Sequence, residues 1–270
     1  MTRRYSLTPL VCISVALFVG VVIVTAIAPH LWPWTLSLLL LNHFILAGAT
    51  LWPRSSLLGS NMVRLSDAAA ASGKVAITID DGPDPDVTPR VLEVLRRHKA
   101  TASFFCIGER VAAYPDLCRA IIAAGHSIEN HSQRHLHRFS LLGPRAIMRE
   151  VRTAQDSIET VCGQRPHFFR APAGLRNPFL DPILHKLNLQ QASWTRRGYD
   201  TRVSDPQVIY QRLTRGLAAG DILLLHDGHA ARTANGVPVI LEVLPQLLET
   251  IAAHGLHTTL LHTADAAPRA

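Results

Sequence analysis

Two adjacent carboxylates follow a short apolar run in the first third of the chain. Asp80 and Asp81 come directly after residues 75–79 and before a Gly-Pro pair. The apolar run is typical of a strand buried on both faces. Side chains alternate between faces within a strand, but a turn at the strand end breaks this alternation, so both carboxylates can face one site. The competing interpretation is that Asp-Gly-Pro serves only as a turn.

Two histidines with a spacing of four suggest a partner for these carboxylates. His131 and His135 occur in the sequence HSQRH, and this spacing places two imidazoles on one side of a helical turn. The spacing alone is weak in a chain with 14 histidines. Two histidines and one carboxylate nevertheless form a common site for a hydrolytic divalent metal. We interpret three further histidines as non-ligands: His98, His126 and His137.

An arginine and another histidine also follow apolar runs. Arg170 comes after residues 167–169, and its guanidinium is suited to holding a catalytic carboxylate in the ionised form, although a plain loop arginine is the alternative. His226 ends the run DILLLH. A histidine at the end of a buried strand favours a general acid over a histidine that only fills the core.

The elements that must position these residues alternate between strand and helix patterns from residue 74 onward, which predicts a parallel α/β domain. Seven strands are expected, at residues 75–79, 101–107, 126–130, 167–169, 189–194, 221–226 and 256–261. Six helices are expected, at residues 87–97, 116–124, 144–161, 178–187, 206–219 and 238–254. The alternation favours a barrel-like closure, and an open doubly wound sheet is the alternative. In both folds functional side chains gather at the carboxyl ends of the strands.

The first 53 residues are predicted to be a membrane anchor. No charged residue occurs between Arg4 and Arg54. Two apolar runs, at about residues 10–28 and 33–52, each approach the roughly 20 residues that cross a bilayer as a helix. The remaining divisions are a linker at residues 54–73, the α/β domain at residues 74–264 and a tail at residues 265–270.

Arginines at the two ends of this anchor predict its orientation. Arg3 and Arg4 precede the first run, and Arg54 and Arg64 follow the second, so the positive-inside bias places the domain on the cytoplasmic side. The expected location is a bacterial inner membrane, crossed twice. A periplasmic domain is the alternative, because one miscounted span reverses the orientation. Residues 26–28 (Ala-Ile-Ala) also imitate a signal-peptide cleavage site.

The net charge limits the expected binding partners, and the cysteine spacing indicates the state of the thiols. The formal net charge of +7 comes mostly from arginine, but the sequence has no basic helix or aromatic-interleaved patch that indicates nucleic-acid binding. Proximity to anionic lipid or to a phosphorylated, lipid-linked substrate suits this charge better. Cys106, Cys118 and Cys162 lack CxxC spacing, so we expect buried thiols there. The oligomeric state is not predicted.

Four motifs occur in order along the domain, TIDDGP, HSQRH, RAPAG and LLLHDG. Together they resemble the polysaccharide deacetylases (NodB-homology domain, carbohydrate esterase family 4), and the resemblance covers about residues 74–262. It implies a distorted, incomplete (β/α)7 barrel and a metal-dependent hydrolase. The expected reaction removes an N-acyl group, acetyl, from an amino sugar in a glycan or a lipid-linked saccharide. Zinc is the expected metal, with cobalt, nickel, manganese and iron as alternatives.

The resemblance also implies a role for individual residues. The implied roles are general base for Asp80, orientation of that base for Arg170, general acid for His226, support of the acid for Asp200, a backbone oxyanion donor at Ala173, metal ligands at Asp81, His131 and His135, and substrate contacts at Pro172, Trp194 and Leu224.

Two positions depart from the family pattern. The family usually has an aromatic residue where Ala173 stands, and a tryptophan where Thr201 follows Asp200. Alanine keeps the backbone N–H but lacks the ring that shapes the pocket, so we expect intact catalysis on an atypical substrate. The competing functions are deformylation of a lipid-linked amino sugar and hydrolysis of an O-acetyl ester. A non-catalytic glycan-binding module is the alternative from another class.

Overall fold

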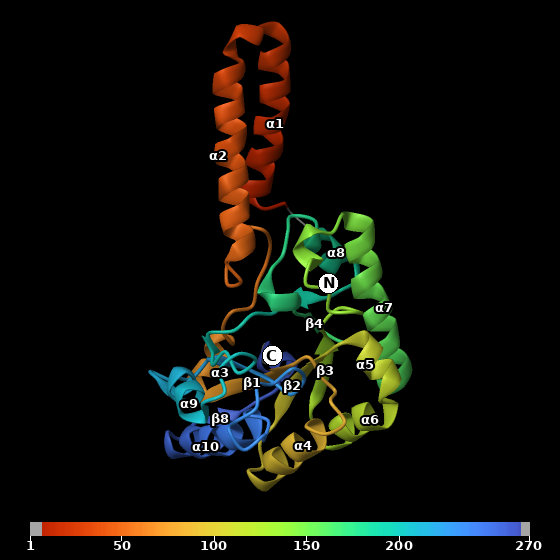
Figure 1. Cartoon of the computed structure of the whole chain (residues 1–270), viewed down its shortest axis with the longest axis vertical. Helices are drawn as coiled ribbons and strands as arrows, with labels where there is room; N and C mark the ends of the chain where they lie inside the picture. The colour runs from red at the N-terminus through yellow and green to blue at the C-terminus, as the bar shows by residue number, and fades with distance from the viewer. Residues whose placement is uncertain (1–6, 266–270) are drawn as a thin grey trace.

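Two long apolar helices stand on one side of an α/β domain in the computed structural model, which describes residues 7–265 (Figure 1). Helix α1 spans Pro9–Ile27 and helix α2 spans Trp32–Leu51, with a 3-10 turn at Pro29–Leu31 between them. At 1.5 Å per residue each helix is about 30 Å long, close to the thickness of a bilayer core. Both helices are long and apolar enough to cross a membrane.

Polar side chains inside this hairpin pair with each other. The Ser14 hydroxyl donates to Asn42 Oδ1 at 2.9 Å, and the Thr25 hydroxyl donates to the Thr35 hydroxyl at 3.2 Å. Asn42 is buried against the neighbouring helix. Polar groups that face a neighbouring helix can be satisfied there, which makes them compatible with an apolar surrounding.

The hairpin returns the chain to the side on which it starts. The Thr8 hydroxyl donates to the Leu57 carbonyl at 2.8 Å, so the beginning of α1 and the segment after α2 are neighbours. Arg3 and Arg4, on which the predicted orientation depends, lie outside the described residues, as does the expected tail beyond residue 265.

Residues 54–73, expected to be a linker, pack against the domain. Helix α3 (Asp67–Ala71) lies in this segment. Met62 forms a parallel bridge with Ala192 beside the sheet, and Met62 and Leu65 are buried in a cluster with strand residues. The apolar residues of the segment are too few and too widely spaced to show a period, which is why the pattern did not predict this packing.

Eight parallel strands form one curled sheet in the order β5-β4-β3-β2-β1-β7-β6, with β8 also paired to β1. The strands are β1 Lys74–Asp80, β2 Ala102–Cys106, β3 Ser127–Asn130, β4 Phe168–Phe169, β5 Gln190–Gln191, β6 Arg196–Arg197, β7 Ile222–His226 and β8 His257–Thr258. Strands β5 and β6 end this order without pairing to each other, so the sheet is a half-barrel. The predicted incomplete barrel is confirmed.

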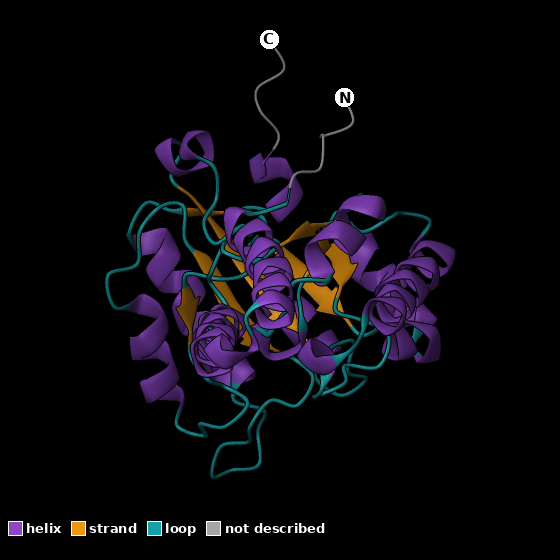
Figure 2. Ribbon diagram, turned by 90° about the horizontal axis from the view of Figure 1, so that it is seen from above, coloured by secondary structure: helices purple, strands orange, loops and turns teal. Residues whose placement is uncertain are grey.

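Helices surround the sheet, as the view from the hairpin side shows (Figure 2). They are α4 Thr88–Arg97, α5 Gly108–Ala113, α6 Pro115–Ala123, α7 Pro144–Cys162, α8 Leu180–Lys186, α9 Pro206–Thr214, α10 Ile240–Ala253 and α11 Leu261–Asp265. Short 3-10 turns occupy Phe139–Leu141 and Pro172–Gly174. The six expected helices are present. Sequence analysis missed α3, α5, α11 and β6, which are too short to show a period.

Strand β1 lies in the middle of the sheet and sets the position of the site. Val75, Ile77 and Ile79 are fully buried in the main core between the sheet and its helices. Burial of each such side chain contributes about 1.5–3 kcal/mol. The register places Asp80 level with His226 on the adjacent strand β7. Packing of the core therefore fixes the positions of Asp80 and His226 at the carboxyl end of the sheet.

Candidate active site

The carboxyl ends of the strands open into a cleft of about 660 Å³. Asp80 is the last residue of β1 and His226 is the last residue of β7, while His131 follows β3 and Arg170 follows β4. The predicted residues that line the cleft are Asp80, Asp81, His131, His135, Ala173, Trp194, Leu224 and His226. Buried behind this lining are Arg170, Pro172 and Asp200.

A buried ion pair holds Asp80. Arg170 Nη1 donates to Asp80 Oδ1 at 2.5 Å, and Asp80 Oδ2 lies 3.8 Å from His131 Nε2. Burial lowers the pKa of Arg170, and the charge of Asp80 opposes that effect. A charge-assisted hydrogen bond from a guanidinium is short and strong, and it fixes the position of the carboxylate. Oδ1 is thus engaged, which leaves Oδ2 toward the histidines.

Further contacts fix the guanidinium of Arg170 itself. Its Nη1 also donates to the Thr78 hydroxyl at 2.9 Å, and its Nη2 donates to the Ser193 carbonyl at 2.9 Å. Its Nε donates to the Ala192 carbonyl at 3.3 Å. The guanidinium carbon lies 4.0 Å from the centre of the Phe105 ring. These contacts use most of the rigid fork of donors, so Arg170 has little freedom to turn away from Asp80.

Three side chains form a cluster with the geometry of a metal site. One ligand atom from each of Asp81, His131 and His135 lies within 4.8 Å of the other two. Asp81 Oδ1 is 3.2 Å from Nε2 of both histidines, yet this buried oxygen has no hydrogen-bond partner among the described residues. A buried carboxylate oxygen without a hydrogen bond needs another partner. Two imidazoles and a carboxylate fit a divalent metal ion with one or more open positions.

A loop brings the two histidines together, and the predicted helical turn is wrong. Ser132 and His135 have φ angles of 65° and 51°, which no right-handed helix accommodates. The backbone N–H of Ser132 donates to Asn130 Oδ1 at 2.9 Å, and the backbone N–H of His135 donates to the Ser132 hydroxyl at 3.1 Å. These bonds wrap the segment so that both Nε2 atoms face Asp81.

The protonation states of the cluster suit metal binding. His131 Nδ1 lies 2.8 Å from the Arg170 carbonyl, which only accepts, so Nδ1 donates this hydrogen bond and Nε2 is the nitrogen that faces Asp81. Burial lowers the pKa of His135 to about 4. Burial raises the pKa of Asp81, but the neighbouring His131 and His229 outweigh burial and hold that pKa well below its usual value. Neutral imidazoles and an ionised carboxylate are the forms that bind metals.

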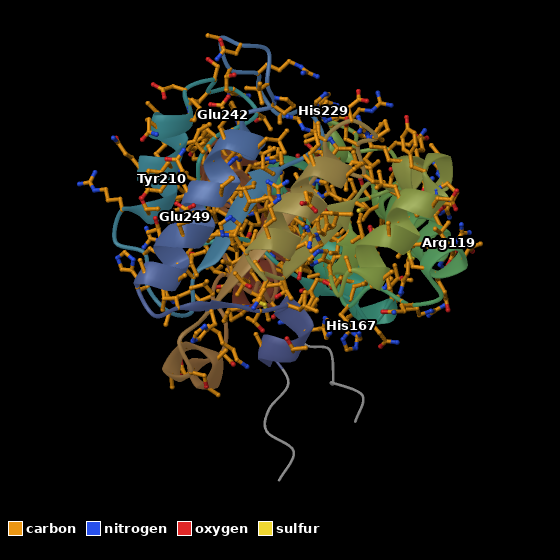
Figure 3. All side chains as sticks on the ribbon, turned by 90° about the horizontal axis from the view of Figure 1, so that it is seen from below. Arg119, His167, Tyr210, His229, Glu242 and Glu249 are labelled. Carbon is orange, nitrogen blue, oxygen red and sulfur yellow. The ribbon has the colours of Figure 1, made fainter. Side chains whose placement is uncertain are left out.

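His229 is a site residue that sequence analysis missed. Its Nδ1 lies 3.4 Å from Asp81 Oδ2, and its ring centre lies 6.5 Å from that of His135. The hydrogen bond to Asp81 raises the pKa of His229. Its position in the domain is labelled in Figure 3. The signal was its place three residues after His226, beyond the same strand end.

His226 is paired with Asp200. His226 Nδ1 lies 2.8 Å from Asp200 Oδ1, and the backbone N–H of His226 donates to Asp200 Oδ2 at 2.7 Å. Burial lowers the pKa of His226, but the charge and hydrogen bond of Asp200 outweigh burial and raise that pKa to about 9. His226 is therefore protonated at neutral pH, with Nδ1 bound to Asp200 and Nε2 on the opposite side of the ring.

The wall of the cleft is small at the two positions that depart from the family pattern. Ala173 and Thr201 line the cleft together with Trp194 and Leu224. Ala173 has a φ of 55°, within a tight turn. Arg197 also lines the cleft, and its guanidinium carbon lies 5.4 Å from the centre of the Trp194 ring. An indole and a guanidinium therefore shape this side of the cleft.

Fold and site together define an α/β half-barrel hydrolase, and comparison with known proteins gives its family. The polysaccharide deacetylase family model matches residues 67–192. A peptidoglycan-N-acetylglucosamine deacetylase of Bacillus cereus is 34% identical over 175 residues, which cover 64% of this chain and 81% of that protein. A chitooligosaccharide deacetylase of Bradyrhizobium sp. is 36% identical over 156 residues, covering 57% and 71% respectively. The chain belongs to the polysaccharide deacetylase family, and the two relatives named here are deacetylases, which are hydrolases of carbon–nitrogen bonds other than peptide bonds.

Solved structures share the fold. A family 4 carbohydrate esterase from Streptomyces lividans, in complex with acetate, superposes with a TM-score of 0.64 at 30% identity and covers 72% of this chain and 97% of that chain. A pseudoenzyme of the same family from Bacillus anthracis superposes with a TM-score of 0.67 at 22% identity, covering 76% and 68%. The second likeness concerns the fold alone, so catalysis must be argued from the residues of the cleft.

Proposed function

We propose that this protein is a membrane-anchored, metal-dependent hydrolase that removes an N-acetyl group from an amino sugar. The observation that carries the proposal is the convergence of three kinds of group on one cleft. Asp80 is a carboxylate held by a buried arginine, a carboxylate and two histidines form a metal-type cluster, and His226 is a protonated histidine on the adjacent strand. The names of the relatives from Bacillus cereus and Bradyrhizobium sp. support an N-acetylated sugar as the substrate class.

Asp81, His131 and His135 would hold one divalent ion. Zinc is the first choice for two imidazoles and one carboxylate, and cobalt, nickel, manganese and iron suit the same donors. When bound, such an ion supplies Lewis acidity that polarises the amide carbonyl and lowers the pKa of the attacking water.

Asp80 acts as the general base. Its Oδ1 is occupied by Arg170 at 2.5 Å, so Oδ2 is the atom that accepts the proton of the attacking water. Arg170 is a positioning residue, because it holds and orients the carboxylate of Asp80 without touching the substrate. A general base of this kind contributes on the order of a hundred- to ten-thousand-fold to the rate.

His226 acts as the general acid. It gives the Nε2 proton to the amine as the carbon–nitrogen bond breaks, while Asp200 keeps hold of Nδ1 at 2.8 Å. The backbone N–H of Ala173 is positioned by the turn after Arg170, and we assign it to the oxyanion of the tetrahedral intermediate. The products are a free amino sugar and acetate.

An assay of purified, zinc-loaded full chain tests this function. N-acetylated, N-formylated and O-acetylated sugars are incubated separately, and released acid and new free amine are measured. The proposal expects acetate and amine in equal amounts from the N-acetyl sugars. Faster release of formate indicates a deformylase of an amino sugar, and release from the O-acetyl sugars alone indicates an esterase. Sugar binding without any release indicates a glycan-binding module, as the shared fold of a pseudoenzyme allows.

We further propose that α1 and α2 form a two-span anchor in a bacterial inner membrane with the domain on the cytoplasmic side. The hairpin supports an even number of crossings, since the segments around Thr8 and Leu57 are neighbours. Fusion of one-sided reporters after the last residue tests the orientation. Activity of a cytoplasmic reporter supports it, and activity of a periplasmic reporter alone places the domain on the other side.

A further inference from the structure

A second cavity, of about 740 Å³, lies between the end of α2 and the domain. On the helix side it is lined by Gly48, Leu51 and Trp52, which belong to the last turn of α2 and its cap. Within residues 7–265, every charged residue that lines it is an arginine, and no carboxylate is among the lining residues. We call it the arginine pocket, after its five arginines, Arg54, Arg196, Arg197, Arg212 and Arg215.

Among the residues that the structure describes, a carboxylate pairs with only one of these arginines, Arg196. Arg196 Nε donates to Asp221 Oδ2 at 2.5 Å, and its other nitrogens donate to the carbonyls of Arg215 and Gly216. The guanidinium of Arg196 is thus used in joining β6 to the loop before β7. The other four arginines keep a positive charge that no described carboxylate pairs with.

Two of the remaining guanidinium groups are held close to one aromatic ring. The guanidinium carbons of Arg197 and Arg212 lie 5.0 Å and 5.6 Å from the centre of the Tyr199 ring. Arg197 Nε is buried without a hydrogen-bond partner among the described residues, and Arg212 Nη1 donates to the Gly198 carbonyl at 3.2 Å. Like charges on one ring repel each other, and an orphaned donor needs an acceptor. An anion that enters the pocket would offset the repulsion between these two guanidinium groups, which both belong to residues that line it.

The arginine pocket adjoins the catalytic cleft. Trp194 and Arg197 line both cavities. The chain leaving α2 is fixed at the same place, because the Ser193 hydroxyl donates to the Pro53 carbonyl at 2.6 Å. A Cβ atom at Gly174 would lie 2.6 Å from the Trp194 ring and 2.7 Å from Pro53. The anchor therefore packs directly on the loop that carries Ala173, and a single wall of side chains separates the two cavities.

The arginine pocket lies at the end of α2, at the level where lipid headgroups would surround a membrane-spanning helix. Leu51 and Trp52 are exposed apolar residues at the domain end of α2, and tryptophan favours the membrane–water interface. If α2 crosses the bilayer, the pocket lies where the phosphates of lipids lie. This location favours the phosphate of a lipid over that of a soluble compound, because a soluble compound does not require a binding site beside a membrane helix.

We propose that the arginine pocket binds the phosphate or diphosphate of a lipid-linked amino sugar while the N-acyl group of the same molecule lies in the catalytic cleft. This inference rests on the proposed function and names its substrate class. Arginine is suited to the task because its planar fork binds phosphate oxygens in pairs.

The test uses the zinc-loaded full chain in proteoliposomes and two substrates, polyprenyl-phosphate N-acetylglucosamine and a soluble N-acetylglucosamine oligosaccharide. The variant R212Q/R215Q removes two exposed guanidinium groups of the pocket. The matched control R90Q/R119Q removes the same charge from exposed positions of α4 and α6; Arg119 is labelled in Figure 3, seen from the side opposite the hairpin.

We expect R212Q/R215Q to raise KM for the lipid substrate about ten-fold or more relative to its effect on the soluble oligosaccharide. The control R90Q/R119Q should match the wild type on both. Equal losses on both substrates overturn the inference, and so does a wild type that hydrolyses the oligosaccharide but not the lipid substrate. UDP-N-acetylglucosamine as a third substrate separates the sources of phosphate, since faster turnover of this soluble compound also overturns the lipid assignment.

A binding measurement keeps the two proposals distinguishable. If the wild type releases acetate from neither substrate, the proposed function fails, and the pocket is then tested through the fluorescence of Trp52 and Trp194, which line it. Vesicles containing polyprenyl phosphate should give a saturable change that R212Q/R215Q loses. An equal response to phosphatidylglycerol vesicles, or an unchanged response in the variant, overturns the inference.

Discussion

The two cavities that meet at Trp194 hold their charges in opposite ways. In the catalytic cleft, each charged group that we assign to proton transfer has a buried partner of opposite sign. Arg170 lies 2.5 Å from Asp80, and Asp200 lies 2.8 Å from His226. In the arginine pocket the lining contains five arginines and no carboxylate.

The catalytic cleft is built to hold reacting groups in place, whereas the arginine pocket leaves positive charge unpaired. Proton transfer needs atoms held in place, so the cleft supplies the partners itself, and both Arg170 and Asp200 are fully buried. Anchoring a phosphate needs positive charge that is left open to a ligand, and Arg212 and Arg215 are exposed. The unpaired arginines beside the catalytic cleft therefore indicate that the substrate supplies the negative charge at the arginine pocket.

Loss of the metal cluster should have the largest effect on the cleft. Asp81→Asn removes the negative charge that two histidines face at 3.2 Å, so we expect loss of bound zinc and of acetate release together. Elemental analysis and the acetate assay measure the two on one sample. Chelation of the wild type should abolish activity, and added zinc should restore it. Full activity after the metal has been removed contradicts the assignment.

Weakening the arginine behind Asp80 should have the next largest effect. Arg170→Lys keeps a positive charge but loses the fork that joins Thr78 and Ser193, so we expect kcat to fall on the order of a hundred-fold. Arg176→Lys is the matched control, because Arg176 is also buried but binds the Ser60 carbonyl, away from Asp80. Equal losses of kcat in both variants, after correction for folded protein, indicate a purely structural role.

Removing the partner of His226 should shift a pH profile more than it changes a maximum rate. Burial lowers the pKa of His226 and Asp200 raises it to about 9, so Asp200→Asn should lower that pKa. The alkaline limb of kcat/KM should move down by about one pH unit or more. Asp205→Asn, at the exposed N-cap of α9, is the control. An unmoved limb excludes His226 as the group that titrates there.

The raised pKa of His226 also predicts how the free energy of unfolding changes with pH, which unfolding measurements at several pH values can test. The pKa of His226 is higher in the folded state than its ordinary value of 6.5. The pair with Asp200 therefore stabilises the folded state fully below the ordinary value and loses that contribution as pH rises through about 9.

The sequence predicted what depends on local pattern. The run before Asp80 indicated a buried strand, and the strand ends indicated where Asp80, His131, Arg170 and His226 would meet. It did not predict the loop between His131 and His135, because a spacing of four suits both a helical turn and a loop whose residues adopt positive φ.

Contacts between distant segments were also beyond the sequence pattern. The place of His229 just beyond the end of β7 was only a weak signal for its contact with Asp81, and nothing in the local sequence brought Arg212 to the ring of Tyr199. The packing of residues 54–73 against the domain belongs to the same class. Such contacts depend on how the half-barrel curls, and no period along the chain records that curvature.

The most direct test of the account follows both products of one reaction in heavy-oxygen water. Zinc-loaded wild type should release acetate that carries the heavy oxygen, with one free amine for each acetate. Asp80→Asn should retain its zinc and react on the order of a thousand-fold more slowly, because only the base is lost. Wild-type protein that binds zinc yet yields no amine from any N-acyl sugar, or an Asp80→Asn variant as fast as the wild type, would contradict the central claim.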